Sequence, residues 1–88
     1  MKIKDGFVMR EVVGQAVVIA VGEASKEFHG MINLNSTGKD IWQGVEKGLS
    51  EEGIVQCIIE KYEVEVEKAA EDVRKMIQKM REAGVIEA

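Results

Sequence analysis

The sequence has few of the side chains that metal sites and catalytic centres use. Its 88 residues include one histidine, His29, and one cysteine, Cys57, which fall in different predicted elements. A zinc site or a nucleophile with its general base needs more ligands or partners than these two residues supply. The sequence also has no G-x-x-x-x-G-K-[ST] phosphate loop. We therefore expect no metal, no cofactor and no independent enzyme activity, with His29 in a loop and Cys57 as a small filler on a helix.

Long apolar stretches are also absent. The longest purely apolar run, residues 16–21, is far shorter than the roughly 20 residues that a membrane-spanning helix needs. The first residues, MKIKDG, contain no apolar signal region, and a single cysteine cannot form an internal disulfide. We therefore expect a soluble protein in the reducing environment of the cytoplasm, with no membrane partner.

Basic residues are outnumbered and scattered. The chain has 16 acidic and 12 basic residues, a net charge of −4, and no block of Lys and Arg. Because nucleic-acid binding depends on Lys and Arg that neutralise phosphates, this balance argues against DNA or RNA as a partner. Hydrophobic residues make up 45% of the chain and charged residues 32%, which is typical of a folded globular protein. The length predicts one domain over residues 1–88.

Two β-branched segments near the start predict a hairpin. The segments 7–13 and 16–21 flank Gly14-Gln15, a two-residue turn in which the glycine can take the positive φ of a type II′ turn. If residue 13 pairs with residue 16, one face carries Arg10 and five apolar residues, and we expect that face to be the core side. The five are Val8, Val12, Val17, Ile19 and Val21. The opposite face is apolar enough for part of it to be covered as well; it consists of Met9, Glu11, Val13, Ala16, Val18 and Ala20.

A third strand and two capped helices are predicted next. Residues 22–30 are polar and bounded by glycines, so they indicate a loop that returns the chain to a strand over 31–34. Asn35 or Ser36 is expected to cap the first helix, and Ser50 the second, where Leu49 and Ile54 occupy the positions of a hydrophobic staple. The apolar stripes of these helices are Ile41, Trp42 and Val45 on the first, and Ile54, Ile58 and Tyr62 on the second.

The third predicted helix has an unusually wide apolar arc. It begins near 65–67 and ends at about 83, where Gly84 supplies a left-handed cap and residues 85–86 fold back. At about 100° per residue the arc covers roughly 140°, more than the ~100° of a helix that rests on one core, so one flank is expected to contact something else. The arc is formed by Ala69, Ala70, Val73, Met76, Ile77, Met80 and Ala83.

The order of these elements predicts the fold class. Three strands followed by three helices in one small domain indicate an α+β, winged-helix-like arrangement, in which the helices pack on one face of a three-stranded antiparallel sheet.

The sequence resembles the PqqD family, coenzyme PQQ synthesis protein D, over nearly its whole length. The resemblance rests on FVMREVVGQAVVI in the hairpin and on HGMINLNSTGKDIW, in which G-x-I-x-L-N-x-T-G followed by Ile-Trp is the most distinctive part. Glu65 departs from the family, which more often has a short capping residue there. Further similar positions are Tyr62, Ala69, Asp72, Val73, Met76, Met80, Gly84, Val85 and Ile86.

The resemblance implies a peptide chaperone of natural product biosynthesis. The family belongs to the RiPP recognition elements, which hold the leader peptides of ribosomally synthesised precursors and present them to a modifying enzyme, often a radical SAM enzyme. The leader would lie as an extra strand on the strand 31–34, beside the third helix. Ile32 and Leu34 are expected to be core residues that offer a ligand only their backbone. The implied peptide-binding residues are Gly30, Met31, Ile32, Asn33 and Leu34 on the strand, and Ala70, Val73, Arg74, Ile77 and Arg81 on the helix.

Two other functions compete with leader binding. A winged-helix DNA-binding regulator would need a helix with several exposed Lys and Arg, and neither of the first two predicted helices has one. A structural module could instead form a homodimer through the open edge of its sheet, because an exposed strand edge is a template for pairing with another chain.

Overall fold

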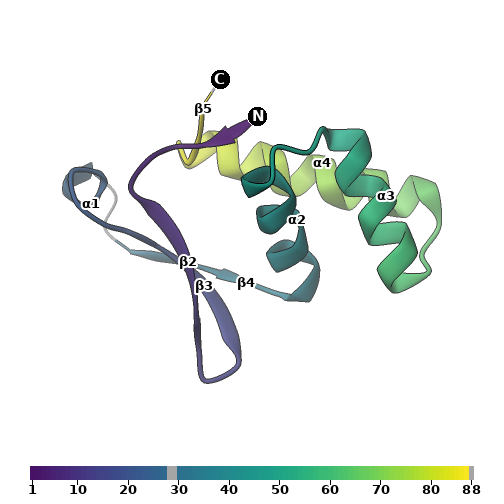
Figure 1. The fold of residues 1–88 in the computed structure, drawn as a ribbon, viewed down its shortest axis with the longest axis horizontal. Coiled ribbons are helices and arrows are strands. Elements are labelled where there is room, and N and C mark those ends of the chain that lie inside the picture. Colours follow the sequence, from purple (N-terminus) through teal and green to yellow (C-terminus); the bar gives the residue numbers. More distant parts are fainter. Residues whose placement is uncertain (28–29, 88) are drawn as a thin grey trace.

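A three-stranded antiparallel sheet lies beside three helices in this computed structural model, which describes residues 1–27 and 30–87 (Figure 1). The sheet has the order β2-β3-β4, and its strands are Phe7–Val12, Gln15–Ala20 and Met31–Leu34. The helices that follow are α2 (Ser36–Glu46), α3 (Glu51–Tyr62) and α4 (Val66–Glu82). This arrangement confirms the predicted α+β class. In the described part of the chain no helix is long and apolar enough to cross a membrane.

Three short elements were not predicted. Strand β1 (Lys2–Ile3) pairs antiparallel with β5 (Ile86–Glu87), so the two ends of the chain lie side by side (Figure 1). The fold-back after α4 is thus confirmed, and it ends in a two-stranded sheet. The predicted loop 22–30 contains the one-turn helix α1 (Ala24–Glu27), which makes the loop assignment wrong there. His29 lies outside the described residues.

The turn of the β2–β3 hairpin lies one residue earlier than predicted. Val12 pairs with Gln15, and the two turn residues Val13 and Gly14 have φ values of 51° and 78°. Positive φ at both positions defines a type I′ turn, whose twist matches that of the flanking strands better than most two-residue turns do. The Gln15 side chain is used elsewhere, because its Nε2 donates to the Leu34 carbonyl oxygen at 2.8 Å.

The core face of the sheet is also the opposite of the one predicted. Ala16 and Val18 are buried and pair with Leu34 and Ile32, so this side of all three strands faces the helices. The face expected to be buried points away from the helices, and Met31 on it is 61% exposed, although Val17 on the same face is buried. Both faces of the hairpin are apolar, so periodicity alone could not choose between them. Strand β4 decides the matter, since its apolar face is that of Ile32 and Leu34.

The predicted helix caps are present. The Asn35 side chain accepts a hydrogen bond from the Gly38 N–H at 2.7 Å, and the Ser50 hydroxyl accepts one from the Gly53 N–H at 3.1 Å. Helix α4 begins after Glu65, which makes no side-chain cap bond, and Gly84 behind its end has the expected positive φ of 77°. These caps satisfy backbone donors that each helix start leaves unpaired.

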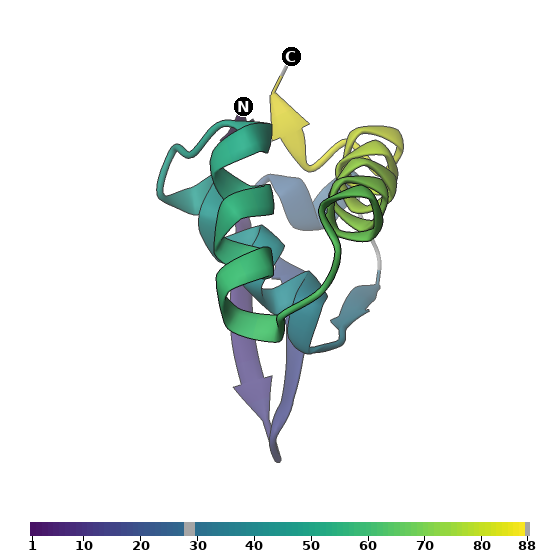
Figure 2. The ribbon, with the colours of Figure 1, turned by 90° about the vertical axis from the view of Figure 1, so that its right-hand side faces the viewer.

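The helices meet the sheet through a core that contains Trp42. Its side chain is 0% exposed, as are those of Val18 and Val73. Helices α2 and α3 approach closely at Gly44, where a Cβ atom would lie 2.8 Å from Cγ1 of Ile54. Figure 2 shows α4 almost end-on beside α3, with the β2–β3 hairpin extending away from the helices.

A polar cluster joins α2 to the end of α3. Asp40 accepts a hydrogen bond from the Tyr62 hydroxyl and one of 3.0 Å from the Lys61 amine. The hydrogen bond to the Asp40 carboxylate raises the pKa of Tyr62 above its ordinary value of 10.0, and burial adds to this. The same carboxylate raises the pKa of Lys61. The cluster therefore ties the two helices together on the side where α3 ends.

Candidate functional site

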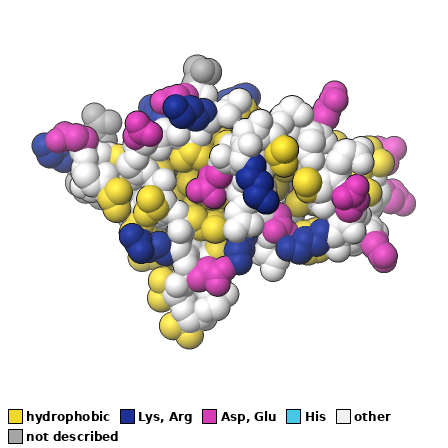
Figure 3. Space-filling model, in the orientation of Figure 1, with side chains coloured by type: hydrophobic (Ala, Val, Ile, Leu, Met, Phe, Trp, Pro, Cys, Tyr) yellow, Lys and Arg dark blue, Asp and Glu magenta, His cyan; other side chains and the backbone are white. Residues whose placement is uncertain are grey.

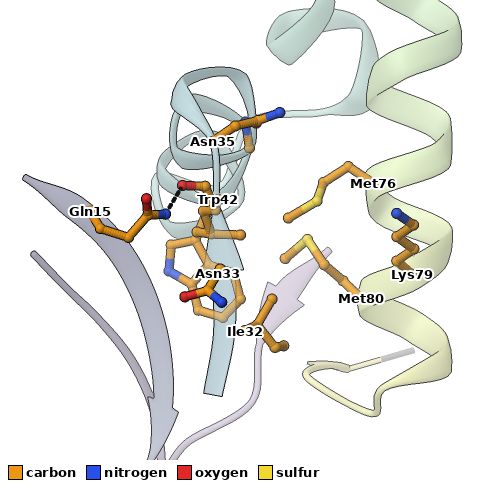
Figure 4. Close-up of a pocket in the computed structure, with 10 residues that line it drawn as sticks. Gln15, Ile32, Asn33, Asn35, Trp42, Met76, Lys79 and Met80 are labelled. Carbon is orange, nitrogen blue, oxygen red and sulfur yellow. Dashed lines mark hydrogen bonds between the residues drawn. The ribbon is translucent and has the colours of Figure 1, made fainter.

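A groove with an apolar floor runs between strand β4 and helix α4. Its volume is about 480 Å³, within the range of small-ligand pockets. Ile32 and Leu34 come from the strand, Trp42 from α2, and Met76 and Met80 from α4. In Figure 4 the two methionines extend from α4 toward β4 and Trp42. Methionine is flexible and polarisable, so this wall can adapt to apolar side chains of different shapes.

Polar groups line the rim of the groove. They belong to Gln15, Asn33, Asn35 and Lys79. The Gln15 amide is fixed by its bond to the Leu34 carbonyl, drawn as a dashed line in Figure 4. Asn35 is fixed by its cap bond to Gly38. The groove therefore combines an apolar floor with a few oriented polar groups, which is the usual composition of a binding site.

The outer edge of β4 has no partner strand among the described residues. β4 pairs only with β3, and it is the last strand in the sheet order. Because Val12 and Gln15 close a two-residue turn, they form a hydrogen-bonded pair, and such pairs alternate along an antiparallel ladder. This register directs the main-chain groups of Ile32 and Leu34 toward β3. Those of Met31 and Asn33 point to the open edge, which gives two N–H donors and two carbonyl acceptors for an added strand.

The helix residues predicted to flank the groove lie elsewhere. Ala70 and Arg74 line a separate hollow with α3, and Val73 and Ile77 are buried in the core. Arg81 is exposed and does not line the groove. On the predicted strand, Ile32, Asn33 and Leu34 line the groove, whereas Met31 points to the outer face and Gly30 is exposed before it.

The groove lies at the edge of the wide apolar arc opposite the edge that was predicted to flank it. At about 100° per residue, Met76, Met80 and Lys79 lie toward one side of α4, and Ala70 and Arg74 toward the opposite side, where α3 packs. The width of the arc indicated that one flank of α4 had something else to contact. The arc is nearly symmetric, so its width did not indicate which flank. A signal for the flank that lines the groove was Met76, which lies toward the edge away from Ala70, with Met80 one turn later.

Lysines on the outer side of α4 differ in their partners. Lys68 contacts Asp72 at 3.0 Å, and Lys75 contacts Glu71 at 2.7 Å. The bond from Lys75 lowers the pKa of the Glu71 carboxyl below its ordinary value, and the bond to Asp72 raises the pKa of Lys68. Lys79 has no ion pair in the described part of the chain. Its charge on the groove rim is therefore uncompensated.

Trp42 carries a buried donor without an acceptor. Its indole Nε1 is the one buried side-chain nitrogen or oxygen atom without a hydrogen-bond partner in the described part of the chain. In Figure 4 this nitrogen lies on the side of β3, away from the methionines of α4. Trp42 is 0% exposed, so the carbon part of its ring supports the apolar floor from within the core.

Among the side chains that the structure describes, no three of His, Cys, Asp or Glu are placed to hold a metal ion. Cys57 is a free, exposed thiol on α3.

Figure 3 shows side chains of both charges over the face in view, and apolar side chains at the tip of the β2–β3 hairpin, where Val13 is fully exposed.

Comparisons with known proteins agree with this architecture. The chain is similar to "TbiB1 in complex with the TbiA(beta) leader peptide", with 24% identity, a TM-score of 0.82, and coverage of 100% of this chain and 96% of that chain. It is also similar to a lasso peptide synthetase B1 complexed with the leader peptide, with 20% identity, a TM-score of 0.78, and coverage of 96% and 93%. At these identities the likeness establishes the fold. A comparison with curated proteins finds no match.

A family comparison matches most of the chain. Residues 15–86 fit the family described as coenzyme PQQ synthesis protein D (PqqD), which confirms the resemblance seen in the sequence. The matched range contains β3, β4 and the three long helices, and so includes every residue that lines the groove. The chain therefore belongs to the PqqD family.

Proposed function

We propose that this protein binds the leader peptide of a ribosomally synthesised precursor and presents it to a modifying enzyme. The observation that carries the proposal is the open edge of β4 directly beside an apolar groove. A peptide added to that edge gains main-chain hydrogen bonds from Met31 and Asn33. Its alternate side chains enter the groove, where Ile32 and Met76, the partly exposed apolar residues of the lining, provide apolar contact. Such a combination of main-chain bonds and side-chain pockets is typical of strand addition, in which the backbone supplies affinity and the pockets supply selectivity.

The relatives support a peptide as the ligand. Both similar solved structures are of proteins in complex with a leader peptide. The open edge of this chain is only four residues long, which suits a short linear segment better than a second folded sheet. A ladder of this length with two or three apolar anchors is compatible with micromolar or tighter binding, since 1 μM corresponds to about 8 kcal/mol.

The composition of the groove favours presentation over catalysis. Among the described residues that line it, none is Ser, Cys, His, Asp or Glu, so the lining offers no nucleophile with a general base. A second protein must then modify the precursor. The family resemblance suggests a radical SAM enzyme or another peptide-modifying enzyme for that role.

The test is a titration of isotope-labelled protein with candidate leaders. Short open reading frames encoded beside this chain supply the candidates, each synthesised as its N-terminal half. We expect the amides of Met31 and Asn33 and those around Met76 and Met80 to shift most, with the outer face of α3 nearly unchanged.

Two proline variants separate the open edge from general damage to the sheet. Asn33→Pro removes an N–H that points to the open edge of β4 and should abolish or strongly weaken binding. Glu11→Pro is the matched control, because the same ladder alternation points its N–H outward at the opposite edge of the sheet. Circular dichroism must show both variants folded. A folded Asn33→Pro protein that binds as tightly as wild type would exclude strand addition at β4.

A further inference from the structure

Among the described residues that line the groove, one has a charged side chain, Lys79. Lys68 and Lys75, on the same helix, each form an ion pair with a carboxylate of that helix. Lys79 has no such ion pair in the described part of the chain: the positions four residues away are Lys75 and Ala83, and Glu82, three residues on, accepts a hydrogen bond from Gln78 instead. In Figure 4 its side chain runs along α4 toward the Asn35 end of the groove.

That end of the groove continues into a second hollow of about 280 Å³. The two hollows share Asn35, Gly38, Met76 and Lys79, so they adjoin each other at the start of α2, and we call them together the channel. The charged residues of the second hollow are Asp72, Lys75 and Lys79. Asp72 and Lys75 are each ion-paired within α4, so Lys79 is the charge without an ion pair among the described residues there.

The start of α2 adds to this positive potential. A helix N-terminus carries a partial positive charge, which acidic residues in the first turn usually offset. Helix α3 has Glu51 and Glu52 in that position, whereas the first turn of α2 has no acidic residue. The channel therefore passes from an apolar end at Ile32 to a cationic end between the start of α2 and Lys79.

We propose that Lys79 makes the groove selective for an acidic residue of the bound peptide. This inference rests on the proposed function and specifies its ligand. In an extended strand, side chains that share a face are two positions apart, which is roughly 7 Å. The peptide therefore carries one large apolar residue for the Ile32 end, and an Asp or Glu two or four positions away for the Lys79 end.

The expected preference is modest and depends on salt. An ion pair between partly exposed groups near a helix N-terminus changes affinity by about three- to tenfold. Because the pair is exposed, added salt should reduce this factor. The apolar anchor and the main-chain bonds remain the main source of affinity, so Lys79 acts as a specificity-determining residue.

The experiment is a selection from a displayed library of random linear peptides of about twelve residues, long enough to span the β4 edge and the channel. The targets are wild type, Lys79→Glu, and the matched control Lys47→Glu, which makes the same charge change at an exposed position outside the groove. A peptide is scored as bound in the groove only if it binds wild type and fails to bind the Asn33→Pro variant. Wild type and Lys47→Glu should enrich Asp or Glu two or four positions from a large apolar residue. Lys79→Glu should enrich Lys or Arg there instead.

An enriched peptide then gives the magnitude by fluorescence anisotropy. Replacing its acidic residue with the amide should weaken binding to wild type about three- to tenfold, whereas binding to Lys79→Glu should become somewhat tighter, because the acidic residue faces a like charge there. Groove-bound peptides without a charge preference, or with the same acidic preference on Lys79→Glu, would overturn the role of Lys79 and leave the proposed function standing. If every selected peptide binds Asn33→Pro as well as it binds wild type, the proposed function is refuted, and this inference fails with it.

Discussion

Replacing Trp42 with alanine should remove much of the stability of this fold. The Trp42 side chain is 0% exposed and belongs to the same buried cluster as residues of the sheet and of all three long helices. Truncating a buried Trp to Ala typically costs about 3–5 kcal/mol, through lost apolar contact and the cavity that remains. At roughly 0.05–0.15 kcal/mol per residue, a chain of this length has about 4–13 kcal/mol in total. Trp42→Ala should therefore leave a barely stable or unfolded protein.

Urea unfolding followed by far-ultraviolet circular dichroism measures this loss. With an m value of about 1.5 kcal/mol per M, the midpoint should fall by about 2–3 M. Trp42→Phe should lose less, because its ring keeps most of the apolar contact and removes a buried donor without an acceptor. Val66→Ala, at a side chain that is 56% exposed, is the control and should change stability by about 0.5 kcal/mol or less. A Trp42→Ala midpoint equal to that of the control would refute the position of Trp42 in the core.

Two further predictions concern the Asp40 cluster and the hairpin turn. Tyr62 is the single tyrosine, so the ultraviolet absorbance of its phenolate reports its titration alone. Its pKa is raised in the folded protein by the bond to the Asp40 carboxylate, so the stability from this bond is complete below about pH 10 and is lost as the pH rises through the raised pKa. Asp40→Asn should move the midpoint down toward the ordinary value, and an unchanged midpoint would contradict that cause. Val13 is a β-branched residue at a φ of 51° and is fully exposed, so Val13→Asn should stabilise the protein by about 1 kcal/mol. Thermal unfolding would show this as a rise of several degrees, and a lower midpoint would mean that Val13 makes a contact that its exposure does not reveal.

Local signals in the sequence predicted the helices well. Asn35 and Ser50 bond to the backbone three residues ahead, and this chemistry depends only on neighbouring residues. The left-handed Gly84 is equally local. The strands β1 and β5 could not be found in this way, because two-residue segments have no period to detect.

Features that depend on tertiary contact were harder to predict. The core face of the hairpin was assigned wrongly because both faces carry apolar residues, and β4 chooses between them through the pairs Ala16–Leu34 and Val18–Ile32. The strand half of the candidate site followed from the sequence, since Ile32, Asn33 and Leu34 line the groove. The helix half did not, because the apolar arc of α4 does not tell which of its edges α3 covers.

The pairing of β1 with β5 has a consequence for how this domain can be connected. Lys2 lies opposite Glu87, so both ends of the chain leave the fold from one place, far from the hairpin tip (Figure 1). A short linker could join them, and a new start could be opened between Val13 and Gly14 without cutting a helix. For the same reason the domain can be carried as an insert within a loop of a larger protein, with both connections made at one small area of the host surface.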